Sequence, residues 1–280
     1  MKKIECAIIF AMCILISISI GTVTIPAAKS AVLLHDNRQS IDLPIVMYHG
    51  ISESASGESK YFISKDRFES DLKWYRDSGY TTILPSQLYA YVSGEAILPS
   101  KPILLTFDDG YCNNYTYAFP LLQKYQMKAA ICLIVSLTDK DPEGHGHLTW
   151  DMCREMQASG LVEIASHTYA LHNLEQNGDY FAKGVNGIQR KTGESSWQFQ
   201  MRVLTDLKKS RDILQRELGT APQLFAYPYG ETEPDAEAYL RRLFPMTVIT
   251  GRGEIGTLEG RYHLPRIFVC QETQLGDRLL

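Results

Sequence analysis

Short apolar runs alternate with amphipathic stretches along the chain from residue 43 onward. Several of the runs are apolar throughout rather than at every second position, which favours parallel strands buried on both faces. We therefore predict strands at Pro44–Tyr48, Thr81–Leu84, Ile103–Phe107, Ala129–Val135, Leu161–Ser166, Leu224–Tyr227, Met246–Thr250 and Arg266–Val269.

The amphipathic stretches between these runs carry signals for helix starts and stops. Ser or Thr begins two of them as an N-cap, and a glycine ends or follows each one. The predicted helices are Asp66–Gly79, Ser86–Gly94, Thr149–Gly160 and about Trp197–Leu218, and the polar, glycine-dotted segment Glu175–Glu194 is predicted to be a long loop.

The repeated order of strand and helix predicts a parallel α/β fold. Its simplest form is a single-domain, distorted (β/α) barrel with mostly parallel strands. An open doubly wound sheet is the alternative, which is weakened because no glycine-rich nucleotide-binding sequence follows the first strand.

The N-terminus has a different pattern. Lys2 and Lys3 precede an apolar run from about Ala7 to Ile25, and small residues follow at Pro26–Ala31. This arrangement is typical of a secretory signal peptide, although the run is long enough for an uncleaved membrane anchor. We expect residues 1–30 to direct export, and the rest of the chain to be extracellular or held at the cell surface.

Composition and charge narrow the possible functions. The 280 residues are 45% hydrophobic and 21% charged, as in ordinary globular proteins, and the net charge of −4 offers no basic surface for nucleic acid. The cysteines beyond the N-terminal segment are too widely spaced for a disulfide scaffold or a cysteine zinc site. We expect buried free thiols at Cys112, Cys132, Cys153 and Cys270.

Ionisable residues follow the ends of several predicted strands. His49 follows the first strand, Asp108 and Asp109 follow the third, and His167 follows the fifth. The sequence "YPYG" at Tyr227–Gly230 ends the sixth. Because the carboxyl ends of the strands carry the chemistry in parallel α/β folds, we expect these groups to converge on one rim.

Asp108 and Asp109 place two like charges side by side at a strand end, where they repel each other. A bound cation would remove this repulsion and keep both carboxylates ionised. Gly110 would let the backbone turn, so that both side chains reach one spot. The alternative is an ordinary turn with one capping and one solvated aspartate.

His167 and His172 are five residues apart. On a regular helix they would be about 140° apart, so we expect them on a loop, where both can reach one ion. Two histidines and a carboxylate with one open position are typical of a catalytic zinc or iron site. The competing His145 and His147 are predicted to be surface residues, and His263 to be structural.

The sequence "TFDDG" at Thr106–Gly110, together with His167–His172, resembles the polysaccharide deacetylases that have a NodB-homology domain, the fourth family of carbohydrate esterases. The resemblance covers nearly the whole mature chain, and it implies a catalytic domain over residues 31–280. The sequences at Leu43–Ile51, Phe225–Glu231 and His263–Val269 fit it too.

The chain departs from the common pattern of that family in three ways. Its two histidines are five rather than four residues apart, Tyr227 rather than Arg precedes Pro228, and no Leu-x-Leu-His sequence occurs. These features resemble the subgroup that deacetylates poly-β-1,6-N-acetylglucosamine. In that subgroup the acid comes from an early "YH" pair, which here is Tyr48 and His49.

The resemblance implies a role for each rim residue, and the chemistry of the side chains agrees with it. Asp109, His167 and His172 would bind a divalent metal, with Zn²⁺ the expected ion. Asp108 would be the base that accepts a proton from water, and His49 the acid that protonates the departing sugar amine.

Four further residues are assigned supporting roles. The backbone N–H of Tyr229 would help to hold the oxyanion. Arg266 would orient Asp108 in place of the missing arginine of the "YPYG" motif. Tyr111 and Trp150 are candidates for stacking on sugar rings.

Other functions remain open at this point. The same enzyme chemistry could act on peptidoglycan, chitin oligomers or acetylated xylan. A glycosidase would need carboxyls about 5–9 Å apart on either side of a bond, which neighbouring aspartates fit poorly. A non-catalytic glycan-binding relative would lack a metal ligand or the base. In each case the expected partner is a polysaccharide, with a membrane involved only through residues 1–30.

Overall fold

The computed structural model describes residues 41–54, 60–140, 146–172, 187–251 and 260–279, and every structural statement below concerns these ranges. The predicted signal or anchor at residues 1–30, the boundary at residue 31, His145 and much of the predicted loop Glu175–Glu194 lie outside them. Within these ranges, no helix combines the length and apolar character that crossing a bilayer requires.

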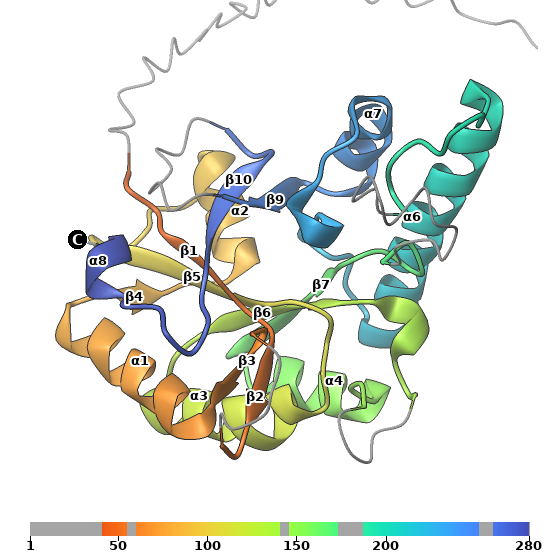
Figure 1. The fold of residues 1–280 in the computed structure, drawn as a ribbon. Coiled ribbons are helices and arrows are strands. Elements are labelled where there is room, and N and C mark those ends of the chain that lie inside the picture. The colour runs from red at the N-terminus through yellow and green to blue at the C-terminus, as the bar shows by residue number, and fades with distance from the viewer. Residues whose placement is uncertain (1–40, 55–59, 141–145, 173–186, 252–259, 280) are drawn as a thin grey trace, which may run out of the picture. The chain divides into compact units, whose positions relative to one another are not determined.

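Seven parallel strands in the described ranges close into a barrel (Figure 1). They run in the order β1, β10, β9, β8, β7, β6, β5, and β5 pairs back with β1. This confirms the predicted barrel and shows that the doubly wound alternative is wrong. The barrel strands are β1 (Ile45–Tyr48), β5 (Pro102–Phe107), β6 (Ala129–Leu133), β7 (Val162–Ser166), β8 (Leu224–Ala226), β9 (Met246–Thr250) and β10 (Leu264–Phe268).

Three further strands lie outside the closed ring. Strand β4 (Thr81–Thr82) pairs with the first residues of β5, and β2 (Gly50–Ser52) pairs with β3 (Phe62–Ser64). The pairing around the barrel is uneven. Strand β7 is in register with β6 along its whole length, whereas Ser166 opposite Phe225 is the single registered pair between β7 and β8 in the described chain.

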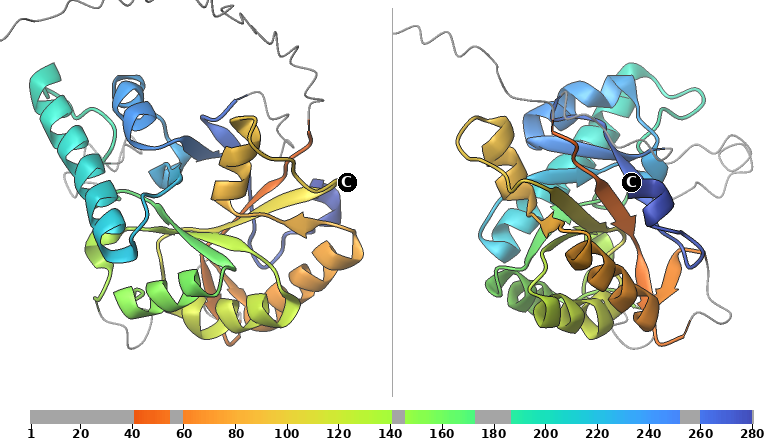
Figure 2. Two further views of the ribbon diagram at one scale, coloured as in Figure 1. Left: turned by 180° about the vertical axis from the view of Figure 1, so that it is seen from behind. Right: turned by 90° about the vertical axis from the view of Figure 1, so that its left-hand side faces the viewer.

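Helices cover the outside of the barrel. Helices α1, α3 and α4 bury apolar side chains against the outer faces of β1, β5 and β6, while α6 and α7 pack on the outer face of β8 (Figures 1 and 2). Helix α2 contributes Leu88 to the apolar cluster of the barrel interior. The helices are α1 (Lys65–Asp77), α2 (Pro85–Val92), α3 (Phe119–Tyr125), α4 (Trp150–Ala158), α6 (Ser196–Leu218), α7 (Pro234–Leu243) and α8 (Gly276–Leu279).

The predicted helices and strands are all present, with ends shifted by one or two residues in most cases. Helices α3, α7 and α8 and the pair β2–β3 were not predicted. Helix α3 follows a π-helical turn at Asn114–Ala118, which breaks the regular spacing of its apolar residues. Helix α7 is a short helix in which Ala236 and Leu240 are buried.

The barrel interior changes from apolar to polar along the strands. Because side chains alternate along a strand, Leu104, Thr106 and then Asp108 follow one another on the inner face after β5 begins. Leu264 is followed in the same way by Arg266. The lower interior, meaning the part away from the carboxyl ends of the strands, is filled by a buried apolar cluster. This cluster includes Ile45, Leu104, Ala130, Leu224, Met246 and Leu264. Polar groups can therefore gather only near the carboxyl ends of the strands.

A buried polar network joins α1 to β1 at Tyr48, the residue that precedes His49. The Tyr48 hydroxyl lies 3.1 Å from Asp71 Oδ2 and 2.7 Å from the Tyr75 hydroxyl, while Arg67 Nε donates to Asp71 Oδ1 at 2.8 Å. Burial raises the pKa of Asp71 to about 6, because Arg67 and Tyr48 offset only part of the desolvation of its charge.

Replacing Asp71 by Asn is expected to change how stability depends on pH. The folded-state pKa of about 6 lies above the ordinary value of 3.8, so stability from this carboxyl is fully present below 3.8 and is lost as the pH rises through 6. Asp71→Asn should therefore gain about 1–3 kcal/mol relative to the wild type between pH 4 and pH 7.

Urea unfolding of both proteins across this pH range measures the difference. Asp66→Asn on the same helix, where the side chain is exposed, is the matched control and should show no such trend. A difference between wild type and Asp71→Asn that stays constant with pH would contradict the assignment.

Candidate active site

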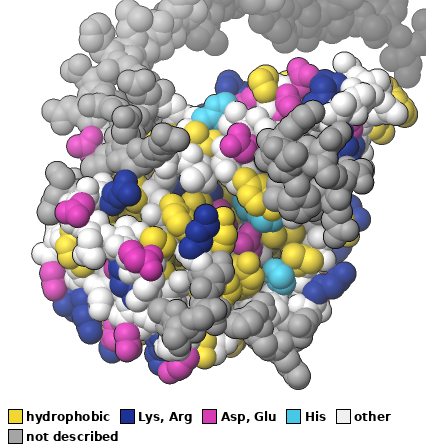
Figure 3. Space-filling view, viewed as in Figure 1, with side chains coloured by type: hydrophobic (Ala, Val, Ile, Leu, Met, Phe, Trp, Pro, Cys, Tyr) yellow, Lys and Arg dark blue, Asp and Glu magenta, His cyan; other side chains and the backbone are white. Residues whose placement is uncertain are grey.

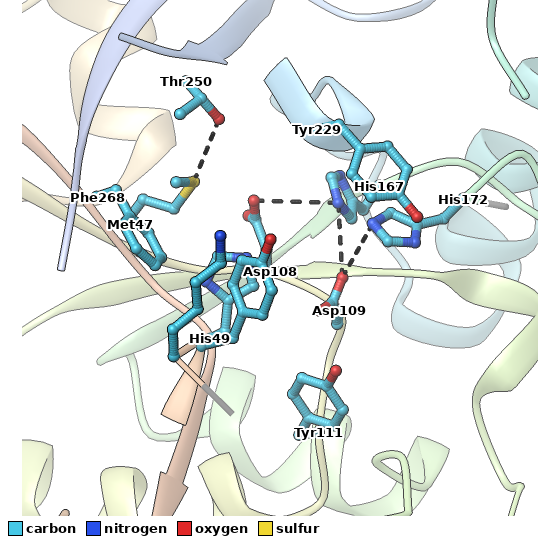
Figure 4. A pocket seen from close by; sticks show the side chains of 12 residues that line it. Met47, His49, Asp108, Asp109, Tyr111, His167, His172, Tyr229, Thr250 and Phe268 are labelled. Carbon is cyan, nitrogen blue, oxygen red and sulfur yellow. Dashed lines mark hydrogen bonds and ion pairs between the residues drawn. The ribbon is translucent and has the colours of Figure 1, made fainter. Parts of the chain in front are cut away.

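A pocket of about 400 Å³ opens at the carboxyl ends of the barrel strands. Figure 3 shows acidic and histidine side chains together among hydrophobic ones on this face, and Figure 4 shows the pocket from close by. Six strand ends each supply a lining residue, namely His49 after β1, Asp108 after β5, His167 after β7, Tyr229 after β8, Thr250 from β9 and Phe268 from β10. The predicted convergence on one rim is therefore present.

The two aspartates reach the pocket through a left-handed turn. Asp108 continues the inward alternation of β5, and Asp109, which would otherwise point outward, has a φ of 71°. Gly110 follows with a φ of 78°, and a Cβ there would lie 2.5 Å from Leu133 Cδ2. We predicted the turn at Gly110, but it begins one residue earlier, at Asp109 itself.

Three side chains in the pocket form a possible metal site. Asp109 Oδ1 lies 3.4 Å from His172 Nε2 and 3.7 Å from His167 Nε2, and all three ligand atoms lie within 4.8 Å of one another. This Asp109 oxygen is buried and has no hydrogen-bond partner among the described residues. An unpaired carboxylate oxygen between two imidazole nitrogens fits a divalent metal with an open position.

The orientation of His167 supports this role. Its Nδ1 lies 2.7 Å from the Ala226 carbonyl oxygen, which can only accept, so Nδ1 carries the proton and Nε2 keeps a free lone pair. Burial lowers the pKa of His167 to about 4, so the ring is neutral near pH 7, as a ligand must be.

Asp108 is held by a different partner. Arg266 is only 1% exposed, and both of its terminal nitrogens lie 2.7 Å from the Asp108 oxygens, with Thr106 Oγ1 at 3.2 Å. Burial alone would raise the pKa of Asp108, but the Arg266 guanidinium holds it well below its usual range. The predicted contact between Arg266 and Asp108 is therefore present, and it keeps an ionised carboxylate beside the candidate metal ligands.

His49 lies on the opposite side of the pocket from His172. Its Nδ1 is buried and has no hydrogen-bond partner within the described ranges, while its ring lies 4.9 Å from that of Tyr61. Burial lowers the pKa of His49, which the charges of Asp108 and Asp109 only partly offset. The imidazole is therefore placed to exchange a proton with a molecule in the pocket.

Tyr229 forms part of the rim beside the candidate metal ligands. Its backbone has a φ of 58°, and its ring stacks on His172 with centroids 4.7 Å apart. The side chain is 43% exposed, so the aromatic face borders the pocket mouth.

The two predicted sugar-stacking residues differ in position. Tyr111 lines the pocket, and burial together with the nearby charge of Asp109 raises the pKa of its hydroxyl. Trp150 instead packs against the core at the start of α4 and lies outside the lining. The geometry therefore retains only Tyr111 as a candidate.

The other histidines and the cysteines have structural surroundings. His147, predicted to be a surface residue, is half-buried, and its ring stacks on Tyr111 with centroids 5.5 Å apart, so that prediction is wrong. His263 is structural as predicted, because its Nε2 lies 2.5 Å from Glu237 Oε1. The four cysteines in the described ranges are free thiols, and three of them are buried, while Cys270 is partly exposed.

Sequence reasoning missed several lining residues. Met47, Thr250 and Phe268 occupy strand positions whose alternation could have indicated them. Lys60 and Tyr61 come from the segment before β3, and no pattern in the sequence points to them.

Comparison with known proteins places this site in a family. Residues 96–246 match the family described as polysaccharide deacetylase. YxkH of Bacillus subtilis (strain 168), whose name also refers to this family, is 34% identical over 81% of this chain and 71% of its own length.

Two further relatives are named poly-β-1,6-N-acetyl-D-glucosamine N-deacetylase. The Staphylococcus aureus (strain MSSA476) protein is 27% identical over 78% of this chain and 72% of its own length. The Escherichia coli (strain K12) protein is 24% identical over 94% of this chain, and the match spans only 43% of that longer protein.

A solved structure supports the same assignment. The de-N-acetylase from Aggregatibacter actinomycetemcomitans superposes with a TM-score of 0.73 at 27% identity, covering 85% of this chain and 99% of that one. On the family match over residues 96–246 and the similarity to YxkH, the chain belongs to the polysaccharide deacetylase family of enzymes.

Proposed function

We propose that the chain is an extracellular, metal-dependent hydrolase that removes N-acetyl groups from an N-acetylglucosamine polysaccharide and releases acetate. Poly-β-1,6-N-acetylglucosamine is the favoured substrate, because relatives from Staphylococcus aureus and Escherichia coli are named for that activity. The observation that carries the proposal is the Asp109–His167–His172 cluster beside an ionised Asp108 in one pocket. The extracellular location rests on the sequence of residues 1–30.

Asp109, His167 and His172 would hold the metal, for which we propose Zn²⁺. Imidazole and carboxylate ligands suit this ion, and a fourth position stays open for water or substrate. When bound, the ion would lower the pKa of a water molecule and polarise the amide carbonyl.

The remaining residues would transfer protons and hold the transition state. Asp108 accepts a proton from the attacking water, and Arg266 keeps it ionised and oriented for this step. As the C–N bond breaks, His49 donates a proton to the sugar nitrogen, which leaves as an amine. The backbone N–H of Tyr229 donates to the oxyanion that forms on the carbonyl oxygen.

The proposed acid step requires His49 to carry a proton when the C–N bond breaks. Burial lowers the pKa of the free imidazole and so disfavours the protonated form that the acid step requires. The charges of Asp108 and Asp109 favour the protonated form and oppose the effect of burial.

The alternatives fit the pocket less well. A glycosidase would need two carboxyls free to flank a bond, whereas Asp108 is paired with Arg266 and Asp109 faces two histidines. A non-catalytic binding relative would have lost a metal ligand or the base, and all four residues are present in the pocket. Peptidoglycan, chitin oligomers and acetylated xylan remain alternative substrates.

Acetate release from a panel of acetylated glycans tests the function. We expect release from poly-β-1,6-N-acetylglucosamine, its loss after treatment with a chelator, and its recovery with Zn²⁺. No release from any glycan after metal has been restored would rule out the enzyme, and activity that survives chelation would rule out the metal.

The two aspartates should respond differently to substitution. Asp108→Asn should bind Zn²⁺ as the wild type does and lose about 10²–10⁴-fold in kcat, because it removes only the base. Asp109→Ala should lose both, because it removes a ligand. Isothermal titration with Zn²⁺ and the rate of acetate release separate the outcomes, and loss of metal by Asp108→Asn would show the roles to be misassigned.

Arg266→Met is expected to move the acid limb of the pH profile. Asp108 must be ionised to act as a base, so activity falls as the pH drops through its pKa. Removing the guanidinium leaves burial to raise that pKa, so the limb in kcat/KM should shift upward by at least about one pH unit. Arg76→Met at an exposed position is the control, and an unshifted limb in Arg266→Met would contradict the proposed role.

A further inference from the structure

The chain segment between His167 and His172 is held in an unusual conformation. Thr168, a β-branched residue, has a φ of 76°, in the left-handed region that such residues rarely adopt. Conformations of this kind persist only where the surroundings hold them in place. The segment must also bring two ring nitrogens five residues apart to the same Asp109 oxygen.

Asp206 on α6 makes the main contacts to this segment. One of its carboxylate oxygens accepts the backbone N–H of Tyr169, and the other accepts that of Ala170, both at 2.8 Å. The side chain is buried on the face of α6 that also carries Val203 and Leu207. A carboxylate on this largely apolar helix face therefore binds two consecutive backbone amides of the segment between His167 and His172.

Ser210, one turn further along α6, holds the other side of Thr168. Its hydroxyl lies 2.7 Å from the Ser166 hydroxyl, which accepts the Thr168 N–H at 3.3 Å. Thr168 Oγ1 in turn accepts the Leu171 N–H at 3.1 Å. Helix α6 is thus bonded to the chain both before and after the left-handed residue.

Stability alone does not account for a carboxylate at this position. Burial raises the pKa of Asp206 to about 6, and the two N–H groups offset only part of that effect. Above that pH the ionised group makes folding less favourable than it would be with an unburied carboxylate. The two hydrogen bonds that this carboxylate accepts give it a role in the geometry of the bound amides.

We propose that Asp206, assisted by Ser210, is a positioning residue that holds the segment 168–171 so that His167 and His172 both face Asp109. This inference rests on the proposed metal-dependent function. Asp206 touches neither the ligand atoms nor the pocket, and it acts through the backbone amides of Tyr169 and Ala170. An amide side chain of the same shape keeps one acceptor and turns a donor toward the second N–H, so it cannot reproduce both bonds.

Asp206→Asn tests this role, with Asp212→Asn as the matched control. Asp212 lies on the same helix, pairs with Lys208 and has a 44% exposed side chain. Zn²⁺ affinity is measured by isothermal titration, ligand geometry by the visible absorption of the Co²⁺-loaded protein, and retention of the fold by circular dichroism. Hydrogen exchange at the amides of Tyr169 and Ala170 reports on the segment itself.

We expect Asp206→Asn to weaken Zn²⁺ binding by about 10–100-fold, alter the Co²⁺ spectrum and speed exchange at both amides. The control should match the wild type in all of these. Ser210→Ala should weaken Zn²⁺ binding by about fivefold, as loss of one hydrogen bond would, and it provides the test if Asp206→Asn fails to fold.

The outcomes separate the two proposals. A folded Asp206→Asn or, failing that, Ser210→Ala protein with wild-type Zn²⁺ affinity and an unchanged Co²⁺ spectrum would overturn the positioning role and leave the proposed function standing. A wild-type protein that binds neither Zn²⁺ nor Co²⁺ would overturn both.

Discussion

The ion pair between Asp108 and Arg266 constrains which side chains can fill the upper barrel, meaning the interior near the carboxyl ends of the strands. Both side chains are buried, and each would be strongly disfavoured there without the other. The pair joins β10 to the end of β5, two strands that flank β1 in the barrel. The buried guanidinium needs further hydrogen-bond acceptors, and Thr106 supplies one. Polar side chains therefore replace the apolar cluster of the lower interior at this level.

This arrangement divides the barrel into two functional levels. The lower level is an apolar core that resists distortion and fixes the strand ends relative to one another. The upper level places ionisable groups from separate strands within a few ångströms, where their charges shift one another's pKa values. The site gains its geometry from the closed sheet and needs only short turns, such as the one at Asp109 and Gly110, to complete it.

The sequence revealed the elements that depend on local pattern. Buried parallel strands are continuous apolar runs, so the strands and the ionisable residues that follow them could be predicted together with the barrel. Contacts between distant elements could not. The two hydrogen bonds from the amides of Tyr169 and Ala170 to Asp206 join residues 37 and 36 positions apart. No sequence pattern near Asp206 or near these amides indicates the contact. The half-buried state of His147 likewise depends on a bridge to Tyr111.

The uneven pairing of the barrel strands has a consequence for how the protein would lose activity. The junction between β7 and β8 has a single registered pair, and the hydrogen bond from His167 to Ala226 crosses that same junction. Regions with few backbone bonds open before the molecule unfolds as a whole. Local opening there would carry His167 away from Asp109 while the helices outside remain in place, so inactivation by heat can precede melting and be reversed on cooling.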